Sequence, residues 1–409
     1  MCNTKTTIEK EQQALGFVEG VALSVGSTGY KYKDRDDLLF MSLAPDTNVA
    51  GVFTKSLCPS APVEYCRKIL PFGKARALVV NAGNANAFTG SAGKIAVQQI
   101  AQATANILNC DPNQVFLAST GVIGEPLEAE PIINLLSSLA NKTTTDNWQK
   151  AAKSIMTTDL FAKYGSRVFT YNGAEITINA IAKGAGMIAP NMATMLCFAA
   201  TNAAISSEIL QKILQRAVDN SFNIITVDSD TSTSDSVILF ATGFADNNPI
   251  YDFIDPMVEV FQSQLNSLFK ELALQIVSDG EGASHLIKIE IAGACSDQSA
   301  RKIALSIANS PLVKTSIAGN DANWGRVIMA IGKAGEPADR DKLAIYFGSN
   351  CVAREGERDP NYDEELLSEY MNNYQIDIKV NMNIGDGKAE IWTCDLTSEY
   401  VAINANYRS

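Results

Sequence analysis

Histidine and regularly spaced cysteine are what this chain has least of. Its 409 residues include a single histidine, His285, and eight cysteines, none of which form a Cys-x-x-Cys pair. A protein zinc site normally needs four Cys or His ligands at such short spacings, so the sequence predicts no metal centre. A Ser-His-Asp or Cys-His arrangement would have to use His285 as its base, because the chain offers no second imidazole.

Long apolar runs and an excess of positive charge are also missing. No stretch approaches the roughly 20 apolar residues of a membrane-spanning helix, and the first residues, MCNTKTTIEKEQQ, lack the apolar core of a secretion signal. The formal net charge of −12 argues against nucleic acid or an anionic membrane as a partner. Unspaced cysteines without a secretion signal fit a reducing compartment, so we expect a cytoplasmic protein.

What remains is an ordinary globular composition, with 46% hydrophobic and 19% charged residues, on a chain long enough for two or three domains. Apolar residues recur at helical spacing in three segments, residues 94–108, 206–218 and 256–277. Short apolar runs typical of buried strands occur at residues 75–80 and 236–240. This alternation of helical and strand patterns predicts an α/β fold.

The pattern changes after about residue 284. Isoleucine or valine alternates with polar residues in two segments, at Ile287, Ile289 and Ile291 and at Ile376, Ile378 and Val380. The second segment is followed by a Gly-Asp-Gly turn at residues 385–387 and another apolar run, an order typical of a β-hairpin. We therefore predict an α/β core domain over residues 1–283 and an α+β domain over residues 284–409.

The most informative segment is KGAGMIAPNMATML, residues 183–196. It is rich in glycine and other small residues, and the residues on either side, 177–182 and 196–201, are apolar enough to form buried strands. A threonine hydroxyl held in such a bend can attack the carbonyl that precedes it. Because Thr194 directly follows Ala193, we predict self-cleavage between these two residues.

Cleavage at this bond would turn Thr194 into an N-terminal residue. Its hydroxyl would then be the nucleophile and its own α-amine the base, as in other threonine–N-terminal-amine centres. An α-amine has a reference pKa of about 7.7–8.0, so it can act as a base near neutral pH without histidine.

Two short patterns point weakly to nucleotides. Residues 184–189, GAGMIA, match a dinucleotide-binding fingerprint, but Pro190 and Asn191 follow where that fold needs a continuing helix. The GSAGK run at residues 90–94 has Phe88 where a phosphate-binding loop needs its first glycine. We therefore expect no bound cofactor.

Residues 119–124, STGVIG, follow the apolar run 115–118. Taken alone, this segment is best interpreted as a turn that ends a strand. Acyl chemistry at Thr194 needs donors for an oxyanion, and Gly121 would let a backbone N–H approach the reacting carbonyl while the Thr120 hydroxyl donates beside it. The segment is therefore our candidate oxyanion hole.

Four further loops allow a structural and a functional interpretation. Residues 81–90 and 320–325 are dense in amides and are either turn clusters or parts of a binding site. Glu281, between two glycines, is either a solvated charge or the partner of a cationic substrate group. Residues 226–235 are acidic and rich in hydroxyls, but their spacing departs from a calcium-binding loop, which favours turn structure.

These segments together resemble the ornithine acetyltransferase family, arginine-biosynthesis proteins that also act as glutamate N-acetyltransferases. The resemblance covers nearly the whole chain. It rests on six segments in the same order, which are residues 81–90, 119–125, 183–196, 279–282 and 310–335 and a C-terminus that reads IWTCDLTSEYVAINANYRS.

The resemblance implies a layered α/β sandwich of the self-cleaving N-terminal-nucleophile type with a smaller C-terminal domain. Cleavage between Ala193 and Thr194 would give an α chain, residues 1–193, and a β chain, residues 194–409. Thr194 would be the nucleophile, and Thr120 and Gly121 would form the oxyanion hole. The substrate site implied by the resemblance consists of Thr157, Lys183, Thr194, Glu281, Asn404 and Ser409.

The implied reaction moves the acetyl group of N2-acetylornithine to glutamate through an acetyl-threonine intermediate, and acetyl-CoA is a possible second donor. The α and β chains are expected to stay together, as an α2β2 heterotetramer. Lys183 would either anchor the substrate carboxylate or lower the pKa of the Thr194 amine. The family pattern continues after Ala283 with Thr-Lys, where this chain has Ser284 and His285. The alternatives are a related self-cleaving amidohydrolase or aminopeptidase and a binding protein without activity.

Overall fold

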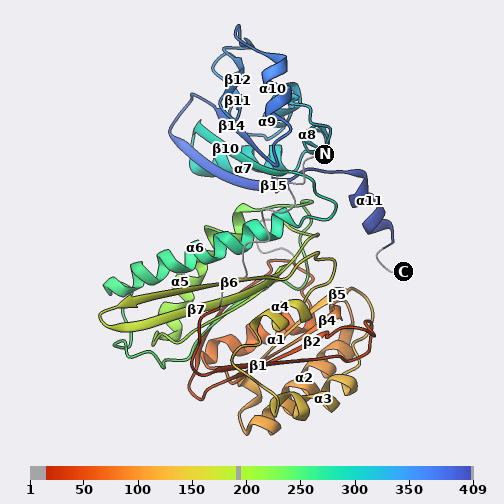
Figure 1. Cartoon of the computed structure of the whole chain (residues 1–409), viewed down its shortest axis with the longest axis vertical. Helices are drawn as coiled ribbons and strands as arrows, with labels where there is room; N and C mark the ends of the chain where they lie inside the picture. The colour runs from red at the N-terminus through yellow and green to blue at the C-terminus, as the bar shows by residue number, and fades with distance from the viewer. Residues whose placement is uncertain (1–14, 190–194, 407–409) are drawn as a thin grey trace. The chain divides into compact units, whose positions relative to one another are not determined.

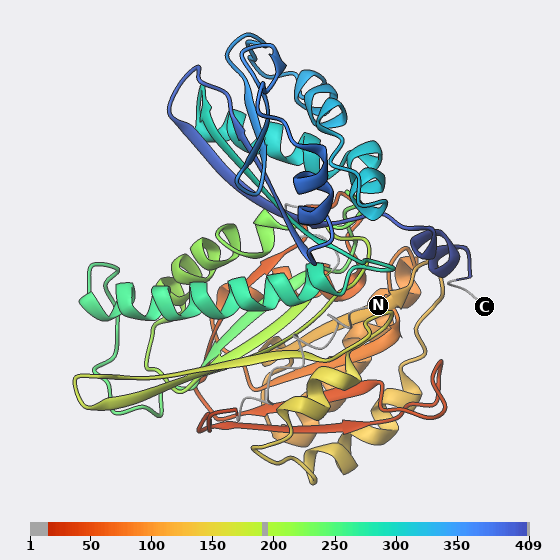
Figure 2. The same cartoon turned by 45° about the horizontal axis from the view of Figure 1, so that its top comes forward.

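The structure is a computed structural model that describes residues 15–189 and 195–406. The described chain divides into two compact units (Figures 1 and 2). The larger unit comprises residues 15–223 and 230–276, and the smaller unit comprises residues 224–229 and 277–406. The division of the sequence at residues 283 and 284 stays a prediction.

Two mixed sheets form the frame of the larger unit. The first has the order β1 (Val21–Gly26), β2 (Leu38–Leu43), β4 (Ala77–Asn84) and β5 (Val115–Val122). The second has the order β3 (Asn48–Phe53), β9 (Ser236–Ala241), β8 (Leu196–Thr201), β7 (Ala174–Lys183) and β6 (Lys163–Tyr171). The β4–β5 and β8–β9 pairs are parallel and the other pairs are antiparallel.

The helices of the larger unit are α1 (Ala61–Ile69), α2 (Gly90–Leu108), α3 (Glu130–Ala140), α4 (Trp148–Ser154), α5 (Ser207–Asp219) and α6 (Pro256–Ser278). Single 3-10 turns occur at η2 (Leu70–Phe72), η3 (Pro112–Gln114) and η4 (Phe222–Ile224). Along the residues that the structure describes, no helix has both the length and the apolar character needed to cross a bilayer.

The main core of the larger unit lies between the two sheets. Phe116 of β5 meets Phe240 of β9 edge to face, with ring centroids 6.2 Å apart, and Trp148 of α4 is fully buried in the same cluster. On its other face the first sheet packs against α2 and α3 through residues such as Val79 and Ile100 (Figure 1). Side chains alternate across a strand, so β4 supplies both clusters and is buried at every position. This layered α/β arrangement confirms the predicted fold class.

The smaller unit contains one six-stranded sheet with helices. The strand order is β13 (Glu357–Arg358), β12 (Asn350–Arg354), β11 (Ala344–Phe347), β14 (Gln375–Asn381), β10 (Leu286–Ala294) and β15 (Gly387–Cys394). The helices are α7 (Asp297–Ala308), α8 (Pro311–Ala318), α9 (Trp324–Gly332), α10 (Glu364–Tyr370) and α11 (Ser398–Ala405). The core of this unit joins Ile287, Ile289 and Ile291 of β10 to Ile303 and Ile307 of α7.

The prediction of a β-hairpin around residues 385–387 is wrong. Strand β10 lies between β14 and β15, parallel to the first and antiparallel to the second. The Gly385-Asp386-Gly387 segment therefore connects two strands that are not neighbours. Alternating apolar residues fit any neighbour with the same pattern, and β10 has that pattern too, so the turn alone did not determine the pairing.

Candidate active site

Lys183 is the centre of a buried polar cluster in the larger unit. It is the last residue of β7, where it pairs with Leu196 at the start of β8, and it is 3% exposed. Its Nζ donates to Thr157 Oγ1 over 2.9 Å and to Thr120 Oγ1 over 3.3 Å. The structure thus brings together three residues that the sequence analysis assigned to the site, from β5, from β7 and from the loop between α4 and β6.

Asp159 connects the residues of this cluster. One carboxyl oxygen accepts from Lys163 Nζ and from the Gly184 N–H, each over 2.7 Å. The other accepts from the Thr157 N–H over 3.0 Å and lies 4.0 Å from Lys183 Nζ. The carboxylate therefore fixes the loop that carries Thr157 against the end of β7.

Burial by itself raises the pKa of a carboxyl, but at Asp159 the charges of Lys163 and Lys183 outweigh it and lower the pKa below its ordinary value. Asp159 and Lys163 have fully buried side chains. Neither residue was predicted from the sequence. The one signal in the sequence was that Asp159 and Lys163 are four residues apart and closely follow Thr157, a predicted site residue.

Gly121 occupies a position that only glycine can take. Its φ of +132° lies in a region that other residues rarely adopt. A Cβ there would meet the Gly83 carbonyl carbon at 2.2 Å and the Asn84 nitrogen at 2.6 Å. The β4–β5 register shifts at this point, directly after the Gly83–Gly121 pair. This close approach is between β5 and β4, and the approach of the Gly121 N–H to a reacting carbonyl stays a prediction.

Asp235, the residue before β9, faces the start of β8. Its Oδ1 accepts from the Met195 N–H over 2.8 Å, and its side chain is fully buried. Burial raises the pKa of Asp235 well above its ordinary value, despite opposing contributions from the Met195 N–H and the Lys183 charge. The sequence of this segment favoured turn structure, and the hydrogen bond from the Ser234 N–H to Ser232 Oγ over 3.0 Å agrees with that. The contact of Asp235 with Met195 was not predicted.

The nucleophile predicted from the sequence, Thr194, lies outside the described residues. The same is true of Ala193, on the other side of the predicted cleavage site, and of the C-terminal Ser409. Their assignments stay predictions. Met195, bonded covalently to Thr194, is the nearest residue that the structure describes on that side.

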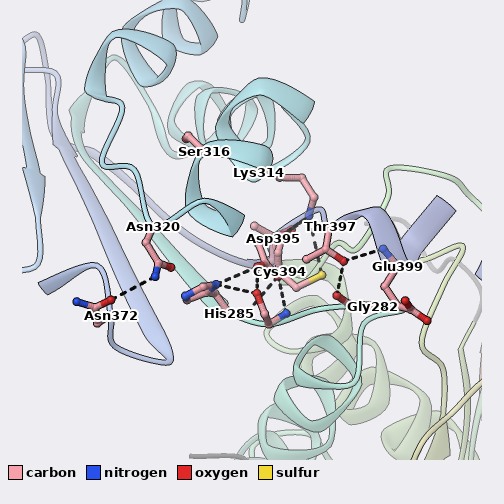
Figure 3. Close-up of polar contacts among 12 residues, drawn as sticks. Gly282, His285, Lys314, Ser316, Asn320, Asn372, Cys394, Asp395, Thr397 and Glu399 are labelled. Atoms are coloured by element: carbon pink, nitrogen blue, oxygen red, sulfur yellow. Dashed lines mark hydrogen bonds and ion pairs between the residues drawn. The ribbon is translucent and has the colours of Figure 1, made fainter. Parts of the chain in front are cut away.

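The remaining two predicted substrate residues lie together in the smaller unit. Asn404 Nδ2 of α11 donates to Glu281 Oε2 over 2.6 Å, and Glu281 is 9% exposed. Thr397, at the N-terminus of α11, donates to the Gly282 carbonyl over 2.7 Å (Figure 3). Gly282 has a φ of +71°, and a Cβ there would meet the Tyr400 nitrogen at 2.6 Å. Helix α11 is therefore fitted closely to the glycine loop that carries Glu281.

His285 does not belong to a Ser-His-Asp relay. Its Nδ1 lies 3.0 Å from Ser284 Oγ and 2.9 Å from Asp395 Oδ2 (Figure 3). A relay needs the serine and the carboxylate on different ring nitrogens, whereas here both meet the same one. Burial alone would raise the pKa of Asp395, but hydrogen bonds from His285 and Ser284 lower it. These contacts anchor the chain after the Glu281 loop to the end of β15.

Two of the amide-rich loops use their side chains for structure. In residues 81–90, Asn81 Nδ2 donates to the Asn84 carbonyl over 2.9 Å, and Asn84 Oδ1 accepts from the Asn86 N–H over 2.7 Å. In residues 320–325, Asn323 caps α9 by accepting from the Arg326 N–H. Among the residues described, no group of three or more His, Cys, Asp or Glu side chains is arranged to hold a metal.

Comparison with known proteins places the chain in one family. Residues 22–409 match the ArgJ family. The arginine biosynthesis bifunctional protein ArgJ of Bartonella henselae is 58% identical over 397 residues, 97% of each chain, and that of Brucella suis is 55% identical over 403 residues, 98% of each chain. A crystal structure of the Bacillus halodurans bifunctional protein argJ is 40% identical and covers 50% of this chain and 96% of its own, with a TM-score of 0.48. The chain therefore belongs to the ArgJ family.

Proposed function

We propose that this protein transfers the acetyl group of N2-acetylornithine to glutamate through an acetyl ester on Thr194. As a member of the ArgJ family it is an acyltransferase of arginine biosynthesis. The substrate pair and the covalent intermediate are our proposal. The observation that carries it is the buried contact of Lys183 with Thr120, which directly precedes Gly121, the residue whose backbone is packed against Gly83 of β4.

The contact with Lys183 determines whether the Thr120 hydroxyl donates or accepts in this pair. A lysine ammonium only donates hydrogen bonds, so Thr120 Oγ1 acts as the acceptor in this pair. Its own O–H can then donate to an oxyanion, together with the Gly121 N–H. This supports Lys183 as the residue that orients Thr120, and its charge would also lower the pKa of a nearby amine.

The enzyme becomes active, in this proposal, by cutting its own chain between Ala193 and Thr194. The resulting α chain, residues 1–193, and β chain, residues 194–409, stay associated and form an α2β2 assembly. Strand β7 belongs to the first fragment and β8 to the second, and these strands are paired along their length in one sheet. Their hydrogen bonds and buried side chains would hold the fragments together after cleavage.

The first half-reaction forms the ester. The Thr194 α-amine accepts the hydroxyl proton while Oγ1 bonds to the acetyl carbonyl carbon, and Thr120 and Gly121 donate to the resulting oxyanion. Collapse breaks the bond to the α-nitrogen of ornithine, which leaves with the proton. In the second half-reaction the glutamate amine attacks the ester, and Thr194 Oγ1 regains a proton as N-acetylglutamate forms.

Glu281 and Asn404 complete the substrate site in this proposal, together with Thr157 and Ser409. The Glu281 carboxylate suits the cationic side chain of ornithine, and Asn404 holds one of its oxygens in place. We further propose that acetyl-CoA is a second acetyl donor, a proposal supported by the word bifunctional in the names of the Bartonella and Brucella relatives.

Denaturing mass spectrometry tests the proposal. Fresh protein should appear as two fragments that correspond to residues 1–193 and 194–409. After incubation with N2-acetylornithine without glutamate, the second fragment should gain the mass of one acetyl group, and added glutamate should remove it. Thr194→Ala should remain a single inactive chain. An uncut wild-type chain with full activity would contradict the proposal.

Acceptor and donor assays separate the alternatives. Release of acetate at the same rate with and without glutamate would identify a hydrolase rather than a transferase. N2-acetylornithine and acetyl-CoA should then be compared as donors with glutamate as the acceptor. Turnover with the first donor alone would restrict the enzyme to one activity.

A further inference from the structure

Met195, the residue after the proposed nucleophile, is held by its backbone on both sides. Its N–H donates to Asp235 Oδ1 over 2.8 Å, and its carbonyl accepts from the Ser236 N–H over 3.2 Å. Its side chain is 2% exposed. From the next residue, Leu196, β8 runs parallel to β9 in register with Ser236. Met195 is therefore a fixed point at the start of β8.

The hydrogen bond to Asp235 constrains more than Met195. A peptide group is planar, and the group that carries the Met195 N–H also contains the carbonyl carbon of Thr194. An acceptor that orients this N–H therefore restricts the direction in which the chain reaches Thr194. Without this acceptor, the peptide plane could turn through the ψ angle of Thr194 and the φ angle of Met195, which would change the direction in which the chain leaves Thr194.

The Asp235 carboxyl is held within the protein. Its side chain is fully buried, and the hydroxyls of Thr54 and Ser232 lower its pKa against the effect of burial. Asp235 also directly precedes Ser236, whose N–H donates to the Met195 carbonyl. The acceptor of the Met195 N–H is therefore fixed by the surrounding chain.

We propose that Asp235 is a positioning residue for Thr194, which it orients through the Met195 amide. This inference rests on the proposed function, because it needs Thr194 as the nucleophile. It adds a residue that the family resemblance did not supply. The charge of Lys183, at the end of β7, lowers the pKa of Asp235, which directly precedes β9, and β7 and β9 are the two neighbours of β8 in the sheet.

Two conservative variants separate a geometric role from a role of the charge. Asp235→Asn keeps an oxygen that can accept from the Met195 N–H but removes the charge. Asp235→Glu keeps the charge but moves both oxygens by one methylene. If Asp235 orients Thr194, the Asn variant should cleave itself and turn over at close to the wild-type rate. The Glu variant and Asp235→Ala should be slower by about 100-fold, as expected for a misplaced reacting group.

The readouts are the time course of conversion into the two fragments and the kcat and KM of the cut fraction. A positioning role lowers kcat and leaves KM near the wild-type value. Asp246→Asn, at an exposed position of the same unit, is the control and should match the wild type. Thermal unfolding confirms that each variant is folded, and if the Ala and Glu variants fail to fold, a slow but folded Asn variant would still overturn the inference.

Three outcomes would overturn the inference. They are a wild-type cleavage rate and kcat in Asp235→Ala, a loss confined to KM, and an Asn variant that is as slow as the Glu variant or slower. These results differ from a failure of the proposed function, in which the wild-type protein itself would show neither cleavage at Thr194 nor an acetyl adduct.

Discussion

Gly121 and Gly83 face each other across β4 and β5 with no room for a side chain between them. A Cβ on Gly121 would lie 2.2 Å from the Gly83 carbonyl carbon, a distance that real structures do not contain. Strand β5 can therefore approach β4 this closely only because residue 121 is a glycine. Gly121, which makes this contact, directly follows Thr120. The geometry of the candidate oxyanion hole therefore depends on the contact between β4 and β5.

Gly121→Ala should abolish acetyl transfer and lower the melting temperature. Gly124→Ala is the matched control, because Gly124 also has a positive φ, +89°, but a Cβ there would meet nothing within 4 Å. Both variants carry a backbone cost of about 1–3 kcal/mol, and only the first adds a steric clash. Activity and thermal unfolding of the two proteins should differ clearly. Equal behaviour would mean that the Gly83–Gly121 contact is unimportant.

Thr120→Val tests the hydroxyl at the same site. The substitution keeps the shape of the side chain and removes a single donor to the oxyanion. Loss of one such donor typically reduces kcat by a factor of about 10²–10³. Steady-state kinetics with N2-acetylornithine and glutamate should show this fall in kcat with little change in KM. An unchanged kcat with a raised KM would make Thr120 a substrate contact instead.

Asp235 and Asp159 should affect stability with opposite dependence on pH. The pKa of Asp235 is raised in the folded protein, so its contribution to the free energy of unfolding is complete below about pH 4 and is lost as the pH rises through the raised pKa. Asp235→Asn should therefore gain stability relative to the wild type as the pH increases. The pKa of Asp159 is lowered, so its contribution is complete above about pH 4 and is lost as the pH falls.

Urea unfolding of the two Asn variants and the wild type, measured from about pH 2 to pH 8, checks both signs, because the Asp159 contribution changes below about pH 4 and the Asp235 contribution above it. Asp159→Asn should be destabilised by about 3–5 kcal/mol at neutral pH, because it leaves Lys163 buried without its counter-charge. Parallel curves for the wild type and Asp235→Asn over this range would show that Asp235 does not titrate there.

The helices and single strands could be predicted because their signals are local. Apolar spacing indicated α2, α5 and α6 to within a few residues, although α2 begins at Gly90 rather than Lys94. Strand pairing is not local. The turn at residues 385–387 suggested a hairpin, but whether β14 or β10 lies beside β15 depends on contacts with a segment almost a hundred residues earlier.

The candidate site was predictable in part for a related reason. Thr120, Gly121 and Lys183 stand in motifs with unusual composition, and the structure brings Thr120 and Lys183 into contact. The segment around Asp159 carries no motif, and residues 226–235, which end at Asp235, favoured a turn. Their roles arise from burial and from backbone N–H groups of distant segments, Gly184 and Met195, which no spacing along the chain reveals.

The end of the chain provides the last test. Terminal residues usually fray and tolerate removal, so deletion of residues 407–409 would ordinarily be harmless. Here α11 is attached to the glycine loop by Thr397 and to Glu281 by Asn404, which keeps the chain ordered up to the residues just before the deletion.

If Ser409 contacts the substrate, as we propose, the truncated protein should have a raised KM or no turnover. Self-cleavage, which in our proposal involves only the larger unit, should continue. Wild-type kinetics for both N2-acetylornithine and glutamate after truncation would remove Ser409 from the site.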